Sequence, residues 1–296
     1  RGMIYRIRHI TRYTYEQPVS QCFNKAHLLP RNTPSQRCLD SHIEVTPKTG
    51  WLREHLDYFG NRYCYFMLQE PHTLLEIDIT SRIDVNPGQP ESALDLGCSI
   101  SEARARIDQA TDEETLLARE FLLDSPMVRA SKQLREYAAP SFSTERTLLS
   151  AIRDLTSRIY EDFTYDPEFS TIATPLHDVL KHKRGVCQDF AHLAIGCLRA
   201  LGFPARYVSG YLETLPPPGQ QKLVGADASH AWFSVYSPGD GWFEFDPTNN
   251  NMPAGQHIVT AWGRDYADVT PLRGIIFDGG GEQTLEVSVD VARLPG

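Results

Sequence analysis

The sequence predicts an α+β protein in which helices pack on an antiparallel sheet and a β-sandwich-like domain precedes them. Three observations support this class. Residues 3–86 alternate apolar and polar positions as strands do, residues 99–161 change to the spacing of amphipathic helices, and the segment after Pro204 returns to a strand pattern. The predicted domains are an amino-terminal β-rich domain at 1–90 and a second domain at 91–296.

The first domain is expected to contain about four to seven strands packed as a small sandwich. "MIYRIRHITRYTYE", "HIEVTP" and "HTLLEIDITSRIDV" are rich in β-branched and aromatic residues, and in the last stretch Leu75, Ile77 and Ile79 alternate with polar residues. The pair Gly60–Asn61 lies between aromatic runs and predicts a hairpin. "NPGQPES", at 86–92, is a turn-rich stretch that predicts the domain boundary.

The second domain divides into a helical segment at 99–161, a core at 162–250 and a β tail at 251–296. Ser99 and Glu102 have capping-box spacing and predict the first helix start. A helix with a wide apolar face is predicted to begin near Cys187 and to end at Gly202. The strands that follow are predicted in "ARYVSGYLET", "HAWFSVYS", "GWFEFD" and "LEVSVDVARL".

Composition and charge narrow the classes of partner. The chain of 296 residues has a formal net charge of -9, which argues against a non-specific nucleic-acid binder. It has no apolar run near the roughly 18 residues that span a bilayer, and "RGMIYRIRHI" lacks the apolar core of a secretion signal. The six cysteines are scattered without a C-x-x-C pair, as in proteins that keep reduced thiols. We therefore expect a cytoplasmic protein that binds neither nucleic acid nor membrane.

Cys187 is the first candidate for chemistry because it is predicted to lie in the first turn of its helix. Free backbone N–H groups and the positive end of the helix dipole favour an anion there. They favour the nucleophilic thiolate, and they can also bind the oxyanion that develops on a substrate carbonyl. On position alone, Cys187 could equally be a small buried hydrophobic residue.

A thiolate nucleophile needs a base, and the base needs an orienting group. His230 begins an alternating strand, the turn at 237–241 reverses the chain, and the return strand ends at Asp246. If Tyr236 faces Trp242 across this turn, His230 lies diagonally from Asp246 on the same face, within reach of it. Asp246 could then hold the imidazole in the orientation that a base requires.

Each of these two residues also has a purely structural reading. His230 could be a strand-end histidine without a role, and Asp246 a turn former before Pro247. A cysteine, a histidine and an aspartate in this order, across a helix and a hairpin, favour the catalytic interpretation.

The same stretches carry a family resemblance. "GVCQDFAHLAIGCLRALGFPARYVSGY", "HAWFSVY" and "GWFEFDPTNN" closely resemble the transglutaminase-like superfamily of papain-fold enzymes. More narrowly, they resemble its bacterial transglutaminase-like cysteine proteases, in which an amino-terminal β domain precedes a papain-like core. Residues 3–85 look like that domain, and "GRDYADVTPLRG" looks like the tail. The resemblance implies Cys187 as nucleophile, His230 as base and Asp246 as orienting acid, with no departure at these positions.

Three more residues are candidates for oxyanion or substrate contacts. Gln188 follows the nucleophile and could donate to an oxyanion, although a helix residue there commonly packs or caps. Tyr165 lies upstream, where the resemblance implies an aromatic or amide donor, although it could simply cover the core. Trp232 shares the strand face of His230 and could line a substrate groove or lie in the core.

No metal or cofactor is expected. Cys187, His192 and Cys197 have a C-x₄-H-x₄-C spacing that matches no common zinc site, and these positions do not converge on one helix. His192 and Cys197 are interpreted as packing residues. No calcium-binding loop pattern is present in the sequence.

The predicted function is therefore thiol-dependent amide chemistry on a protein or peptide substrate, through a thioester on Cys187. Hydrolysis of a peptide or isopeptide bond is favoured, because water needs no dedicated acceptor site. The alternatives are transglutaminase-type acyl transfer to an amine, and a non-catalytic protein that binds peptides.

Overall fold

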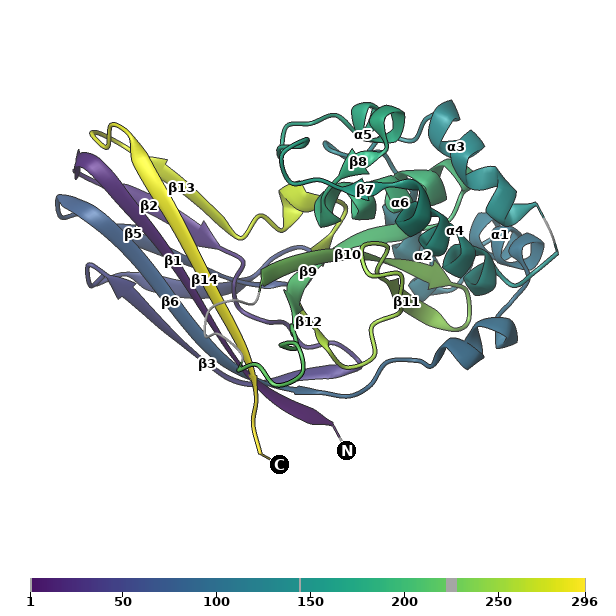
Figure 1. The fold of residues 1–296 in the computed structure, drawn as a ribbon, viewed down its shortest axis with the longest axis horizontal. Helices are drawn as coiled ribbons and strands as arrows, with labels where there is room; N and C mark the ends of the chain where they lie inside the picture. The colour runs from purple at the N-terminus through teal and green to yellow at the C-terminus, as the bar shows by residue number, and fades with distance from the viewer. Residues whose placement is uncertain (1, 144, 222–227, 296) are drawn as a thin grey trace.

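The computed structural model describes residues 2–143, 145–221 and 228–295 and has two lobes (Figure 1). One lobe consists of long strands. In the other, helices cover a smaller sheet, so the α+β class predicted from the sequence is confirmed. Among the described residues, no helix is long and apolar enough to cross a bilayer.

The β lobe is a sandwich of two four-stranded sheets, as the alternating pattern predicted. Their strand orders are β14-β1-β6-β3 and β13-β2-β5-β4, and a buried apolar cluster that includes Phe66 and Ile77 lies between them. The alternation in β6 places one row of side chains in this core and the other row outside. The strands from the first part of the chain are β1 (Met3–Val19), β2 (Cys22–Ala26), β3 (Gln36–Thr46), β4 (Leu52–Leu56), β5 (Arg62–Leu68) and β6 (His72–Val85).

β13 and β14 complete this lobe, whereas the sequence pattern predicts the tail at 251–296 as part of the second domain. β14 (Gln283–Arg293) pairs antiparallel with β1 from Tyr5 to Tyr15, and β13 (Leu272–Ile276) pairs with β2. In Figure 1 the yellow strand runs beside the purple one. The pairing supplies β1 and β2 with the neighbours that their open edges need. The local sequence patterns do not predict this pairing, because the residues of a strand do not indicate which distant strand it pairs with.

The second lobe begins with helices that cover one side of its sheet. They are η1 (Glu91–Leu96), α1 (Ile100–Asp108), α2 (Glu113–Ala118), η2 (Arg119–Leu122), α3 (Lys132–Ala138), η3 (Ala139–Phe142), α4 (Leu148–Asp162), α5 (Leu176–His182) and α6 (Cys187–Leu201). Ser99 caps α1 by accepting a hydrogen bond from the backbone N–H of Glu102, as the sequence predicted. Gly202 ends α6 with a φ of 89°, a left-handed conformation that favours glycine.

The antiparallel sheet of this lobe has the order β11-β10-β9-β12. Its strands are β9 (Ala205–Leu212), β10 (Ala228–Ser237), β11 (Gly241–Phe245) and β12 (His257–Gly263). Two short parallel strands, β7 (Thr164–Tyr165) and β8 (Arg184–Gly185), precede α6, and η4 (Tyr266–Asp268) follows β12.

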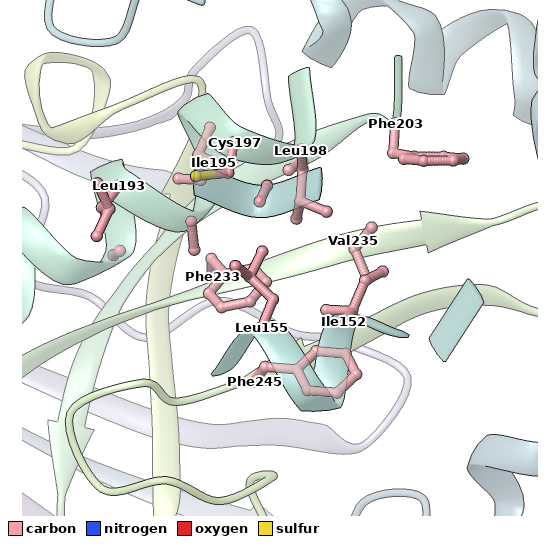
Figure 2. Packing of buried hydrophobic residues seen from close by; sticks show 14 of the residues in the cluster. Ile152, Leu155, Leu193, Ile195, Cys197, Leu198, Phe203, Phe233, Val235 and Phe245 are labelled. Carbon is pink, nitrogen blue, oxygen red and sulfur yellow. The ribbon is translucent and has the colours of Figure 1, made fainter. Parts of the chain in front are cut away.

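The main core lies between this sheet and the helices α4 and α6 (Figure 2). Phe233 and Phe245 project from the sheet toward Leu155 of α4 and Leu198 of α6, and all four are fully buried. Burying each such side chain contributes roughly 1.5–3 kcal/mol. This packing fixes the start of α6 relative to β10 and β11, which are the elements that carry the candidate triad.

Two amide side chains of the β lobe join it to the edge of the second sheet. Gln36 donates to the carbonyl of Val259 at 2.7 Å and accepts from the backbone N–H of Val259 at 2.8 Å. Asn61 makes the same pair of contacts with Trp262, at 2.7 and 2.9 Å. These amides occupy the hydrogen-bonding groups of the edge strand β12, as a neighbouring strand would. His9 and Tyr211 add a buried hydrogen bond of 2.7 Å between the lobes.

Candidate active site

Cys187 is the first residue of α6, as the sequence predicted, and it is half-buried. Val186 is the cap residue, and Asp189 completes a capping box by accepting from the backbone N–H of Val186 at 2.9 Å. Ser170 donates to the same carboxylate oxygen at 2.6 Å. Gly185 allows this approach, because a Cβ at that position would lie 2.8 Å from Asp189. The thiol therefore lies beside the free N–H groups of a well-ordered helix start.

His230 and Asp246 meet at the open end of the β10–β11 hairpin. Tyr236 pairs with Trp242 across the turn, so the register predicted from the alternating pattern is confirmed. Asp246 follows the last residue of β11 and is completely buried. The His230 Nε2 and Asp246 Oδ2 atoms are 2.7 Å apart, which is a short hydrogen bond.

Burial and hydrogen bonding compete in setting the charges of this pair. Burial disfavours the imidazolium of His230, but hydrogen bonds to Asp246 and Cys187 outweigh it and raise the pKa of His230 to about 10. Burial would also raise the pKa of Asp246. Hydrogen bonds from His230 and His257 outweigh this effect and hold that pKa well below its usual value. The pair is therefore a carboxylate and an imidazolium at neutral pH.

His257, the first residue of β12, is a second histidine bonded to Asp246, and the sequence pattern did not predict it. Its Nε2 lies 2.7 Å from Asp246 Oδ2, the same oxygen that binds His230. Because a carboxylate can only accept, Nε2 carries the proton. Its Nδ1 is buried without a hydrogen-bond partner among the described residues. The signal available in the sequence was a polar residue at the start of the apolar run "HIVTAW".

Asp246 is held by further donors from the loop that follows it. The backbone N–H groups of Thr248 and Asn249 donate to Oδ1 at 3.0 and 3.2 Å, and the Asn249 amide donates to Oδ2 at 2.8 Å.

The ligand atoms of His230, Asp246 and His257 lie within 4.8 Å of one another, a spacing that would admit a metal ion. Hydrogen bonds of 2.7 Å already give each of these atoms a partner.

The ring of Trp232 packs against the two histidines of this cluster. It is completely buried, and its indole N–H donates to Glu244 at 2.8 Å. Its ring lies 5.8 Å from the His230 ring and 4.9 Å from the His257 ring, measured between centroids. Of the two interpretations of Trp232, a place in a substrate groove or in the core, its complete burial fits the core.

Tyr165 and Gln188 lie near the thiol. β7 pairs with β8 so that Tyr165 is opposite Gly185, two residues before Cys187. Burial and the charge of Cys187 raise the pKa of Tyr165, yet the side chain is 55% exposed. Gln188 is half-buried and faces a cavity on the helical side. Both residues are near enough to the helix start to stay candidates for oxyanion or substrate contacts.

His192 and Cys197 lie in the packed interior, in line with their interpretation as packing residues. His192 accepts a hydrogen bond from the backbone N–H of Tyr266 at 3.1 Å, and burial lowers its pKa to about 4. Cys197 is completely buried, and burial raises its pKa to about 12. Neither belongs to the cluster around Asp246.

Comparisons with known proteins agree with this architecture. Residues 5–84 match the bacterial transglutaminase-like N-terminal region, and residues 135–247 match the transglutaminase-like superfamily. An uncharacterized protein of Mycobacterium tuberculosis H37Rv is 43% identical over 99% of this chain and 93% of its own length. The protein-glutamine gamma-glutamyltransferase of Pseudomonas aeruginosa is 31% identical over 42% of this chain and 20% of that protein.

A solved structure has the same fold throughout. A crystal structure described as "a Putative Cysteine Protease from Cytophaga hutchinsonii" superposes with a TM-score of 0.77 at 25% identity, covering 100% of this chain and 92% of the other. The fold of both lobes is therefore shared. With the two family matches and the full-length relative, this agreement shows that the chain belongs to the transglutaminase-like superfamily.

Proposed function

We propose that the protein is a cysteine hydrolase that cleaves peptide or isopeptide amides with Cys187, His230 and Asp246. The observation that carries the proposal is the short hydrogen bond between His230 and the buried Asp246, with Cys187, at the start of α6, close enough to the same imidazole to raise its pKa. Nucleophile, base and orienting acid are the three parts that acyl transfer by a thiol requires.

The reaction begins when the Cys187 thiolate attacks the amide carbonyl carbon, which forms a C–S bond and places negative charge on the oxygen. The free N–H groups in the first turn of α6 stabilise this oxyanion. The imidazolium of His230 gives its proton to the leaving amine as the C–N bond breaks, and a thioester remains. Because the pKa of His230 is raised to about 10, the ring carries this proton at neutral pH.

Water completes the cycle in the hydrolytic proposal. Neutral His230 takes a proton from water, whose oxygen attacks the thioester, and the acid product leaves as Cys187 returns to the thiolate. Asp246 keeps the ring oriented and balances its charge in each step.

Acyl transfer is the second candidate. The observation that favours it is the similarity to the gamma-glutamyltransferase of Pseudomonas aeruginosa, which covers 42% of this chain. In that case a primary amine replaces water in the second step, and glutamine is the amide. The same triad can carry out both reactions, so the two reactions differ only in the acceptor, which is water or an amine.

The test is mass spectrometry of products from a glutamine-containing peptide incubated with a primary amine. We expect shortened or deamidated peptide from the wild type and none from Cys187→Ala. An amine adduct as the main product would mean that the reaction is acyl transfer and not hydrolysis. Equal product from the Cys187→Ala variant would overturn the proposed nucleophile. Peptide binding without turnover by either protein would favour the non-catalytic alternative.

A further inference from the structure

One sheet of the β lobe, β13-β2-β5-β4, has a face that points away from the core of the sandwich. Along β2 and β5 buried side chains alternate with half-buried ones, and the buried row lies in the cluster between the two sheets. The other row and its cross-strand partners on β4 and β13 make up the outer surface, which we call the aromatic face. Its residues are Phe23, Lys25, Arg53, His55, Tyr63, Tyr65, Met67, Arg273 and Ile275.

Aromatic rings run across this face in contact with one another. The run begins at Trp51, directly before β4, whose ring centroid lies 6.2 Å from that of Phe23. Phe23 is 5.3 Å from Tyr65, and Tyr65 is 4.9 Å from Tyr63. The His55 ring follows at 5.9 Å from Tyr63. Trp51 and His55 are exposed and the other three are half-buried, so the rings form a continuous track at the surface.

Three cations accompany the rings. Arg273, Lys25 and Arg53 belong to one cross-strand row, in which Tyr65 lies between Lys25 and Arg53. The two arginines each donate a hydrogen bond to a backbone carbonyl. None of the nine residues of the aromatic face is an aspartate or a glutamate. The face is therefore cationic in a chain whose net charge is -9, and it complements a negatively charged ligand.

Charge and topology disfavour several classes of ligand. A symmetric dimer through this face would place its cations against their own copies, which like charges oppose. A nucleic acid carries a charge on every nucleotide and is repelled by the acidic chain as a whole. An extended peptide commonly adds to an open sheet edge, whereas β2 and β5 are paired on both sides. A polymer with apolar ring faces and widely spaced negative charges fits the face better.

We propose that the aromatic face binds an acidic polysaccharide. A sugar ring presents a face of weakly positive C–H groups, which the negative face of an aromatic ring attracts. Carboxylates on such a polymer can pair with Arg53 and Arg273, whose planar guanidinium groups match the geometry of a carboxylate, and with the ammonium of Lys25. This binding goes beyond the proposed amide chemistry and does not depend on it, because the aromatic face includes no residue of the candidate triad.

A cavity adjoins the Trp51 end of the track. It has a volume of about 470 Å³, and Trp51 and Met67 both line it. Lys48, Gln69 and Glu70 lie in the same lining. Such side chains donate to and accept from hydroxyl groups. A volume in the range of small-ligand pockets, about 300–1,000 Å³, suits a sugar unit that stacks on the tryptophan.

The test measures binding of a defined glycan to the full chain by fluorescence anisotropy. The probe is fluorescein-labelled hyaluronate, which carries a carboxylate on every second sugar, and its methyl ester supplies the same sugars without the charge. We expect saturable binding of hyaluronate that weakens as salt is added. The methyl ester should bind about tenfold more weakly, because the partner of the three cations is gone.

Two substitutions separate the charge from the rings. We expect Arg53→Glu, at an exposed position of β4, and Tyr65→Ala, at the centre of the track, each to weaken hyaluronate binding about tenfold. The matched controls are Arg37→Glu, at an exposed arginine of β3 in the other sheet, and Tyr160→Ala, at an exposed tyrosine of α4. Both should change the dissociation constant less than about twofold. Circular dichroism verifies that each variant is folded.

Several results would overturn the polysaccharide site: no saturable binding of hyaluronate, equal binding of its methyl ester, or equal weakening by the control substitutions. Tighter binding of labelled single-stranded oligothymidylate, or of labelled β-casein as an acidic protein, with the same loss in Arg53→Glu would also overturn it and assign the face to that class of partner. Failure of the proposed function looks different, because wild-type protein would then form no product from any peptide while hyaluronate binding follows the expected pattern.

Discussion

At the scale of single residues, Asp246 organises the site through an unusual number of donors. Two histidines and an asparagine donate to Oδ2, and two backbone N–H groups donate to Oδ1. These bonds compensate the cost of burying a carboxylate. His257 donates a hydrogen bond to the carboxylate, so it is a positioning residue for the acid.

His257→Phe removes one donor from Asp246 while an aromatic ring still packs on Trp232. We expect the free energy of unfolding at pH 7 to fall by about 1.5–3 kcal/mol, the usual value of a hydrogen bond to a charged group. The depressed pKa of Asp246 stabilises the fold above about pH 4 and this stabilisation is lost as the pH falls, so the deficit should shrink below that pH. Urea titrations at several pH values measure it.

The controls are chosen to separate this bond from general damage. His257→Gln keeps a hydrogen-bond donor. It should recover part of the stability that His257→Phe loses, together with part of the turnover that His257→Phe loses. His42→Phe, at an exposed histidine of β3, should change stability by less than about 0.5 kcal/mol. A His257→Phe protein as stable as the wild type at pH 7 would show that the second histidine does not hold Asp246.

At the scale of elements, Gly210 of β9 determines how closely the strands of the site approach. It lies opposite His230 on β10 and opposite Val259 on β12. A Cβ here would collide with the carbonyl oxygen of Ile258 and lie 2.9 Å from the Trp232 ring. Only glycine lets β12 bring His257 against Asp246 in this geometry.

Gly210→Ala should therefore loosen the site as well as the sheet. We expect a loss of about 1–3 kcal/mol of stability from overpacking, together with a clear fall in the rate of peptide turnover. Chemical denaturation and the product assay measure the two effects. Gly50→Ala is the control, because a Cβ at that position would have no described atom within 4 Å. Wild-type stability of Gly210→Ala would contradict the close approach.

The sequence could predict the hairpin but not the strand beside it. Strict alternation and a glycine-containing turn set the register of β10 and β11, so the diagonal from His230 to Asp246 followed from local rules. His257 reaches Asp246 only because β12 adds to the far side of β9. That placement depends on tertiary packing and on Gly210, which a pattern within one strand does not contain. The burial of Trp232 likewise depends on tertiary packing, so the sequence left its place in the core or in a groove open.

At the scale of the whole molecule, the two lobes are interlocked rather than joined by a hinge. The β lobe contributes Gln36 and Asn61 to the edge of the second sheet, and the end of the chain returns as β13 and β14 to finish the first. The sequence predicted two domains with a boundary near residue 90, and that boundary stays a prediction. The pairing of β14 with β1 could not be foreseen, because no local signal chooses between distant strands.

Gln36→Ala tests whether the lobes unfold together. It leaves the buried N–H and carbonyl of Val259 without partners, which should cost at least about 2 kcal/mol. We expect calorimetry to show one transition at a lower temperature, because both lobes depend on the junction. Gln69→Ala, at an exposed glutamine, should leave the transition unchanged. Two resolved transitions in either protein would show that the lobes are independent.

The partnership of β1 with β14 also has a consequence for how the chain is made. Of the described elements, β1 is synthesised before all the others and β14 after them, so the edge of β1 that β14 covers has no partner until the other elements have been made. Cys187, His230 and Asp246 all precede β14 in the chain, so the candidate triad is synthesised while that edge is still open. A chain interrupted before Gln283 would carry the complete candidate triad and an unpaired edge on β1, and such an edge is a template for pairing with another chain.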